Sequence, residues 1–137
     1  MPFFTSTYIL YILTGPLPKQ LYNCCDILEV FHTSEKLHND LNGSYINQID
    51  TKGYLDYVNE KRWYKHTNYD DKWSIWWNKE NQYWVIGLTT KKGTDQGDAF
   101  LTTGEKCFTR NTPSTWWIHN GKDWDAAGLS VKCRIIN

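Results

Sequence analysis

Four cysteines carry the most constrained chemistry in this chain, namely Cys24, Cys25, Cys107 and Cys133. They contain no C-x-x-C pair and have no histidine in register, so their spacing does not fit a zinc site. We therefore expect disulfides, in one of two pairings: Cys25 with Cys133 and Cys24 with Cys107, or the converse. Neighbouring strand residues point to opposite faces, so one bridge could lie in the core and the other outside. Four reduced thiols in a cytosolic protein are the alternative.

The stretch KWSIWWNKENQYWVIG, residues 72–87, gathers four tryptophans, one tyrosine and two isoleucines. It predicts a β-hairpin with NKEN, residues 78–81, as its turn, so that Trp76 stands opposite Tyr83 and Ile75 opposite Trp84. One face then holds Trp73, Ile75, Trp77, Trp84 and Ile86, and the other holds Ser74, Trp76, Tyr83 and Val85. The first face is almost wholly apolar, and we expect it to be core.

The second face of this hairpin is the first candidate for ligand binding. Trp76 and Tyr83 either pack beneath a loop or stand in solvent. An exposed pair of rings could stack on a sugar ring or on an aromatic partner. Trp116 and Trp117 are adjacent in the sequence and are candidates of the same kind.

The stretch KRWYKH, residues 61–66, interleaves basic and aromatic side chains, as a site for single-stranded nucleic acid or an acidic sugar would. Arg62 and Tyr64 are its candidate ligand-binding residues. Strand alternation puts these two on one face and Lys61 and Trp63 on the other, which divides the charge. An edge strand protected by charge is the competing interpretation.

The sequence contains neither of two common catalytic motifs, the G-x-S-x-G nucleophile motif and a glycine-rich phosphate loop. Asp95 and Asp98 flank a glycine without the EF-hand ligand order, so we predict no metal and no cofactor. Carboxylates such as Asp70 and Asp71 could meet others only through the fold. Without H-x-H or H-E-x-x-H spacing, scattered surface positions are expected for the four histidines, His32, His38, His66 and His119.

Asn42, Gly43 and Ser44 match the N-glycosylation sequon, which makes Asn42 a candidate glycosylation site. Asn42-Gly43 is also the strongest two-residue signal for a hairpin turn. The turn explains these residues without a glycan.

Strands must position all of these residues. Aromatic residues make up 16% of the chain, and no window sustains the i, i+3, i+4, i+7 pattern of a helix. We predict an all-β fold, a small antiparallel β-sandwich or barrel built of hairpins, with at most a short helical turn within residues 32–40. Strands or hairpins are expected over residues 24–35, 38–48, 53–66, 72–87, 99–108, 116–124 and 129–136, with turns at 42–43, 59–61, 78–81 and 120–121.

A chain of 137 residues is the size of one domain. We divide it into an N-terminal segment, residues 1–20, and a single β domain, residues 21–137. Residues 3–15 are apolar but too short to span a bilayer, so they are either a signal remnant or a first strand. The 15 basic and 15 acidic residues balance, which argues against nucleic acid or an anionic membrane as the main partner and gives no sign of membrane insertion.

The strings NGSY, YVNEKRWYKH, YWVIG, WW and VKC occur in this order. In them the chain resembles a Trp- and Tyr-rich extracellular module of invertebrate multidomain ectodomains, over residues 25–133. The departures are Glu60 and Lys61, where that pattern usually has glycine, arginine or nearby turn residues, and the additional Cys24. The resemblance implies secretion, a β fold and a role in adhesion or recognition, and no catalytic residues are carried over.

We therefore expect an extracellular, secreted binding module that holds a glycan or an extracellular protein through exposed aromatics, rather than an enzyme. One alternative is a structural or assembly subunit with no small ligand, whose aromatics only build a core. Another is a small carbohydrate hydrolase, whose carboxylates only the fold would bring together.

Overall fold

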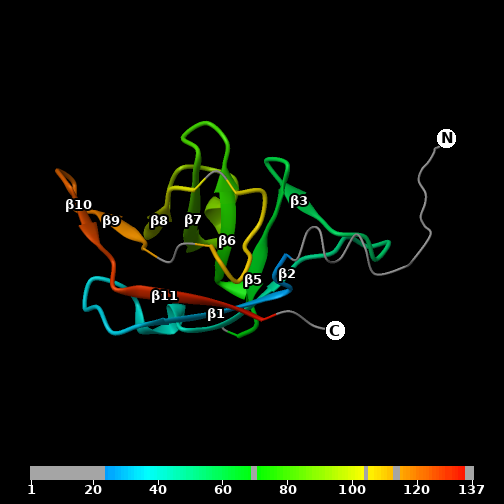
Figure 1. Ribbon diagram of the computed structural model, residues 1–137, viewed down its shortest axis with the longest axis horizontal. Coiled ribbons are helices and arrows are strands. Elements are labelled where there is room, and N and C mark those ends of the chain that lie inside the picture. Colours follow the sequence, from blue (N-terminus) through cyan, green and yellow to red (C-terminus); the bar gives the residue numbers. More distant parts are fainter. Residues whose placement is uncertain (1–23, 69–70, 104, 113–114, 135–137) are drawn as a thin grey trace.

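The computed structural model describes residues 24–68, 71–103, 105–112 and 115–134, and within them the chain is all-β (Figure 1). The predicted fold class is confirmed, since every ladder between the strands is antiparallel. The predicted N-terminal segment, residues 1–20, lies outside the described residues.

The described chain contains short strands and single 3-10 turns. The elements are β1 (Ile27–His32), η1 (Asn39–Leu41), β2 (Gly43–Asn47), β3 (Tyr57–Val58), β4 (Lys61–Arg62), β5 (Tyr64–His66), β6 (Trp73–Asn78), β7 (Tyr83–Leu88), η3 (Thr89–Lys91), β8 (Ala99–Leu101), β9 (Trp117–His119), β10 (Trp124–Ala126) and β11 (Leu129–Arg134). The short helical turn predicted within residues 32–40 overlaps η1, and the final strand lies in the predicted range.

Nine strands form one sheet in the order β10-β9-β8-β7-β6-β5-β2-β1-β11, while β3 and β4 pair separately. β10 and β11 lie at opposite edges of the sheet, yet only Ala127 and Gly128 separate them in the sequence. In a flat sheet with strands about 4.8 Å apart, these edges would lie roughly 38 Å from each other. The three residue steps from Ala126 to Leu129 span only about 11 Å even when the chain is fully extended. The sheet therefore curls, and in Figure 1 β1 and β11 run across the direction of β6 and β7.

The inner face of the curled sheet holds the main hydrophobic core. Alternate residues of β6 and β7 point into it, and Trp73, Ile75, Trp77, Trp84 and Ile86 are at most 3% exposed. These are the five residues that the sequence assigns to the core face, so that assignment is confirmed. Burying each such side chain contributes about 1.5–3 kcal/mol.

The outer face of β6 is buried as well, because residues 89–98 lie over it. The indole N–H of Trp76 donates a hydrogen bond to the main-chain oxygen of Thr94 at 2.9 Å. A Cβ atom at Gly97 would lie 2.1 Å from Cγ1 of Val85, so only glycine lets the loop approach this closely. An outer cluster of Trp63, Trp76, Val85 and Phe100 results, with Val58 and Tyr83 packed against it.

The register of the β6–β7 hairpin differs from the predicted one. Trp76 stands opposite Val85, Trp77 opposite Trp84, and Asn78 opposite Tyr83. Asn78 remains in the strand because its side-chain oxygen accepts a hydrogen bond from the Asn81 N–H at 2.7 Å, so the turn begins one residue later than predicted. Each residue of β6 pairs with a residue two positions further along β7 than predicted. A shift of two residues leaves every side chain on its predicted face.

Of the other predicted turns, two are confirmed and one is wrong. β3 and β4 join through Asn59 and Glu60, both with positive φ, and β9 and β10 join around Asn120-Gly121. Asn42 does not form a two-residue hairpin turn. Residues 33–42 instead make a longer loop from β1 to β2, and the Asn42 side chain closes it by accepting from the His32 N–H at 2.8 Å.

Both expected disulfides are present, and the pairing is Cys24 with Cys107 and Cys25 with Cys133. Cys25 is fully buried in the main core, whereas Cys24 is half-buried at the surface. The two bridges therefore face different surroundings, although Cys24 and Cys25 precede β1 and strand alternation does not apply to them.

Gly97→Ala tests whether close approach of residues 89–98 covers Trp76. We expect the free energy of unfolding to fall by about 1–3 kcal/mol, the usual cost of overpacking, and the Trp76 indole N–H to lose protection from hydrogen exchange. Gln96→Ala is the control, because Gln96 is an exposed residue of the same segment. Unchanged exchange at Trp76 in the Gly97 variant would contradict this role of the loop.

Paired cysteine variants test the disulfide connectivity. Cys24→Ser with Cys107→Ser should leave no free thiol and reduce stability by roughly 2–5 kcal/mol, because it removes one long-range bridge. Cys24→Ser with Cys133→Ser should release two thiols, measured by thiol titration of the unfolded protein. The opposite pattern of free thiols would establish the converse pairing.

Candidate functional site

Exposed tryptophan is confined to one place in the molecule. All eight tryptophans lie in the described part of the chain, and six of them are at most 5% exposed. The exceptions are Trp117 at 37% and Trp124 at 48% exposed. Both lie on the hairpin of β9 and β10, the last two strands at one edge of the curled sheet.

These two tryptophans line a groove of about 350 Å³ on the outer face of the sheet. We call it the aromatic groove, and its lining residues are Tyr83, Phe100, Thr102, Trp117 and Trp124. Phe100 is 7% exposed and lies between two other rings, with its centroid 4.9 Å from that of Tyr83 and 5.3 Å from that of Trp124. The Phe100 and Trp124 planes stand 89° apart, so the rings form a trough rather than a flat platform.

Strand pairing brings the groove residues together from distant parts of the sequence. Phe100 of β8 stands opposite Val85 of β7 on one side and Trp117 of β9 on the other. Residues opposite each other in antiparallel strands share a face, so these side chains point outward together. Trp124 of β10 stands opposite His119, which is also exposed.

The β9–β10 turn that places Trp124 is fixed by one side chain. The Oδ1 atom of Asn120 accepts hydrogen bonds from the N–H groups of Lys122 and Asp123, at 2.9 and 2.7 Å. Its amide nitrogen donates to the Asp125 carboxylate at 3.0 Å, and that carboxylate also pairs with Lys36 at 3.1 Å. The hairpin is thus tied to the β1–β2 loop.

The groove is aromatic and has no charged lining residue among the described residues. Burial raises the pKa of the Tyr83 phenol, and the charge of Asp95 raises it further, so the hydroxyl stays protonated and can donate a hydrogen bond. The accessible lining of the groove is almost wholly apolar. The arrangement suits a ligand with an apolar face.

Two of the predicted ligand-binding residues, Tyr83 and Trp117, meet in this groove. Three others, Trp76, Trp116 and Tyr64, are at most 1% exposed, so the expectation that they form an exposed aromatic surface is wrong. Residues 89–98 cover Trp76. Trp116 neighbours Trp117 in the chain and points inward, where its ring is parallel to that of Phe108.

Tyr64 and Arg62 lie on consecutive strands that belong to different sheets, and they have separate roles. The Tyr64 hydroxyl donates to the main-chain oxygen of Cys25 at 2.7 Å inside the core, and burial raises its pKa. Arg62 faces a different pocket beside the Cys24–Cys107 disulfide. The structure therefore does not bring Arg62 and Tyr64 together as a basic and aromatic site.

Phe100, Thr102 and Trp124 line the groove but are not among the ligand-binding residues predicted from the sequence. Trp124 lies in the predicted hairpin around Asn120-Gly121, and alternation allows only one of Trp116 and Trp117 to share a face with it. Phe100 comes from a strand far away in the sequence. Only the strand order shows that it forms the floor of the groove.

Asn42 and two histidines form a structural network instead of a surface site. The Asn42 amide also donates to the His32 main-chain oxygen at 3.2 Å, so both its polar atoms hold the β1–β2 loop. This arrangement favours the structural role over a glycan at Asn42. The expectation of surface histidines is wrong for His32 and His66, which are 2% and 1% exposed. His66 packs where a side chain on Gly43 would stand.

The fold also brings together two carboxylates that the sequence separates, Asp40 and Asp98. Burial raises the pKa of Asp40, but the hydrogen bond and charge of Lys72 and the nearby Trp73 N–H lower it to below its usual value. Burial, and to a smaller extent Asp40, raise the pKa of Asp98. Such divergent values can separate acid and base roles, and the hydrolase alternative stays a prediction. Within the described residues, no group of three or more His, Cys, Asp or Glu could hold a metal ion.

Asp98→Asn tests this electrostatic description. A raised pKa means that the folded state favours the protonated form, so Asp98 costs stability as the pH rises through its folded-state pKa. We expect the variant to unfold at a higher temperature than the parent protein at pH 7, and the difference to vanish below about pH 4. Asp95→Asn, on the same loop and exposed, is the control. A difference independent of pH would contradict the description.

Comparison with protein-family models, curated proteins and solved structures finds no match for this chain. No helix among the described residues is long and apolar enough to cross a membrane.

Proposed function

We propose that this chain is an extracellular recognition module whose aromatic groove holds a sugar ring of a glycan. The observation that carries the proposal is that the two exposed tryptophans, Trp117 and Trp124, line the same groove. The six buried tryptophans stabilise the fold by removing apolar surface from water. The protein forgoes this stabilisation at Trp117 and Trp124. A subunit whose aromatics only built a core would have no use for this arrangement.

The chemistry of the groove suits a sugar. A sugar ring presents a face of C–H groups, which are attracted to the negative face of an aromatic ring. Trp117 and Trp124 offer such faces in the same groove as Phe100 and Tyr83.

The size of the groove favours a glycan over a protein partner. Its volume of about 350 Å³ lies in the usual range of small-molecule sites. A stable protein interface buries about 800 Å² on each partner, which is more than five side chains supply. An extracellular protein ligand is therefore the alternative outcome of the test.

The two disulfides support an extracellular setting. They join residues 83 and 108 positions apart in the sequence, and bridges of this kind form and persist in oxidising compartments.

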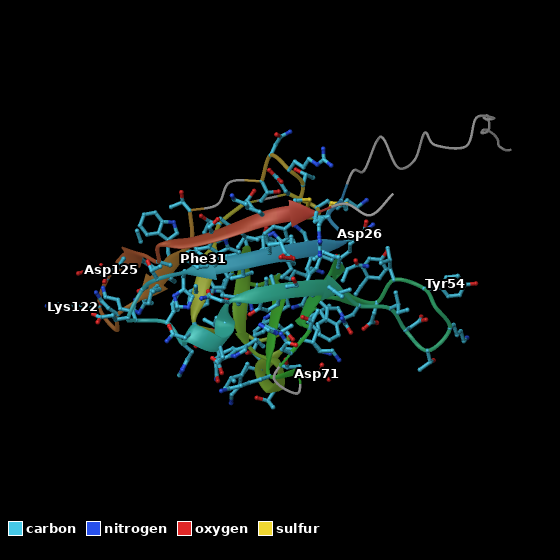
Figure 2. All side chains as sticks on the ribbon, turned by 90° about the horizontal axis from the view of Figure 1, so that it is seen from below. Asp26, Phe31, Tyr54, Asp71, Lys122 and Asp125 are labelled. Atoms are coloured by element: carbon cyan, nitrogen blue, oxygen red, sulfur yellow. A yellow bond between two sulfur atoms is a disulfide. The ribbon has the colours of Figure 1, made fainter. Side chains whose placement is uncertain are left out.

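Alanine variants of the groove tryptophans test the proposal on a glycan array, followed by calorimetric titration with the glycan retained. Trp117→Ala and Trp124→Ala should each weaken binding about tenfold or more, which corresponds to ~1.4 kcal/mol of lost stacking. Tyr54→Ala is the matched control, since Tyr54 is 70% exposed and lies on a loop at the other end of the molecule from Lys122 and Asp125 (Figure 2).

Two outcomes would overturn this function. One is retention of the same glycans by both tryptophan variants while their circular dichroism shows a native fold. The other is an array on which no glycan is retained.

A further inference from the structure

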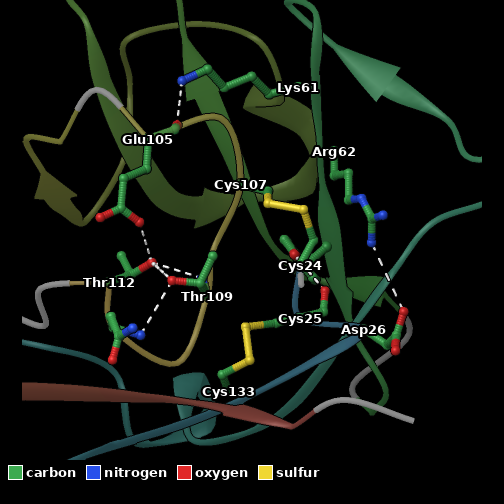
Figure 3. The surroundings of a disulfide bond; sticks show 12 residues. Cys24, Cys25, Asp26, Lys61, Arg62, Glu105, Cys107, Thr109, Thr112 and Cys133 are labelled. Atoms are coloured by element: carbon green, nitrogen blue, oxygen red, sulfur yellow. Dashed lines mark hydrogen bonds and ion pairs between the residues drawn. A yellow bond between two sulfur atoms is a disulfide. The ribbon is translucent and has the colours of Figure 1, made fainter. Parts of the chain in front are cut away.

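We propose that a second pocket, beside the Cys24–Cys107 disulfide, binds an acidic sugar through its carboxylate or sulfate group. The pocket holds about 230 Å³ and is lined by Cys24, Tyr57, Glu60, Lys61, Arg62, Lys106 and Cys107. It lies between the β3–β4 hairpin and the segment around Cys107 (Figure 3). Asp26, beside Arg62, is at the opposite end of the molecule from the β9–β10 hairpin (Figure 2), so this pocket is separate from the aromatic groove.

Lys61 is the first reason to expect an anion. Its ammonium lies 3.5 Å from the centroid of the Trp77 ring and donates a hydrogen bond to the main-chain oxygen of Glu105. Burial lowers the pKa of Lys61, and the charge of Glu105 only partly offsets this. Among the ion pairs of the described residues none includes Lys61. A partly desolvated cation without a close counter-ion gains from binding an anion.

The Glu105 carboxylate is turned away from Lys61. Figure 3 shows the Glu105 side chain pointing to Thr112, whose hydroxyl donates to it at 2.6 Å, while its main-chain oxygen faces Lys61. Glu60, the carboxylate residue of the pocket lining, pairs with Lys79 at 2.6 Å. The carboxylates near the pocket are therefore already engaged with other groups.

Arg62 adds a second positive charge. Its nearest ion-pair contact is with Asp26, at 3.9 Å, which is longer than a hydrogen bond. The planar guanidinium can therefore still present paired N–H donors to a carboxylate or sulfate. Lys61 and Arg62 are neighbours on β4, and both line the pocket. Lys106 brings a third cation to the same lining.

Tyr57 is the reason to expect an acidic sugar in this pocket rather than a simple anion. It is 57% exposed on β3 and lines the same pocket, so its ring can stack on the sugar that carries the charged group. The chain as a whole has a formal net charge of zero. A long polyanion would gain little from the rest of the surface, which favours a ligand that places one acidic residue in the pocket.

The test is calorimetric titration with three probes of equal length: a glucuronate-containing oligosaccharide, a sulfated oligosaccharide and a neutral one. Lys61→Met removes the charge but keeps an apolar stem over Trp77, and Arg62→Gln removes the second charge. Lys52→Met is the matched control, because Lys52 lies on an exposed turn. We expect one or both acidic probes to bind, each pocket variant to weaken that binding about tenfold, and the control to leave it unchanged.

A measurement on the unaltered protein keeps the proposal falsifiable if a pocket variant does not fold. With labelled lysines, NMR titration should show the pKa of Lys61 rising when an acidic probe binds, since an anion favours the charged form. Trp124→Ala should leave acidic binding unchanged, which separates this site from the aromatic groove. Equal binding of neutral and acidic probes, no binding of either acidic probe at millimolar concentration, or an unchanged Lys61 pKa in the bound state would overturn the proposal.

Discussion

The two-residue connection from β10 to β11 is the constraint on which the rest of the structure depends. Ala127 and Gly128 join opposite edges of a nine-stranded sheet, and this is possible only if the sheet curls. Gly128 has a φ of +64° and allows the turn, while the Ala127 N–H donates to the Trp116 main-chain oxygen at 2.7 Å. The curl gives the sheet an inner face that can be filled by large aromatic side chains, and the Cys25–Cys133 disulfide joins the chain just before β1 to the neighbouring strand β11.

Uneven cover of the outer face explains where ligands could bind. Residues 89–98 and the β3–β4 hairpin lie over β6, where Asn59 donates to the main-chain oxygens of Trp77 and Gly93 at 2.7 and 3.2 Å. This cover does not extend over Trp117 and Trp124, which remain exposed. The aromatic groove is thus the uncovered end of the outer cluster, and the disulfide pocket lies where the covering hairpin meets the segment around Cys107.

The sequence predicts the fold class and the two faces of the central hairpin, because strand alternation depends only on parity. It does not predict the register, since that depends on whether Asn78 ends the strand or begins the turn. For the aromatic groove, strand alternation predicts only that Trp116 and Trp117 point to opposite faces of the sheet. Phe100 and Trp124 join Trp117 through strand pairs whose order is a property of the whole sheet. Local pattern carries no information about that order.

We propose that six tryptophans build the fold and that the two exposed ones, Trp117 and Trp124, hold the ligand. The indole N–H signals of all eight can be followed by ¹H–¹⁵N NMR during titration with a glycan retained on the array. We expect the signals of Trp117 and Trp124 to shift and to become protected from a soluble paramagnetic agent, while the signals of the six buried tryptophans stay unchanged. Shifts of the buried tryptophan signals without shifts of the Trp117 and Trp124 signals would contradict this proposal.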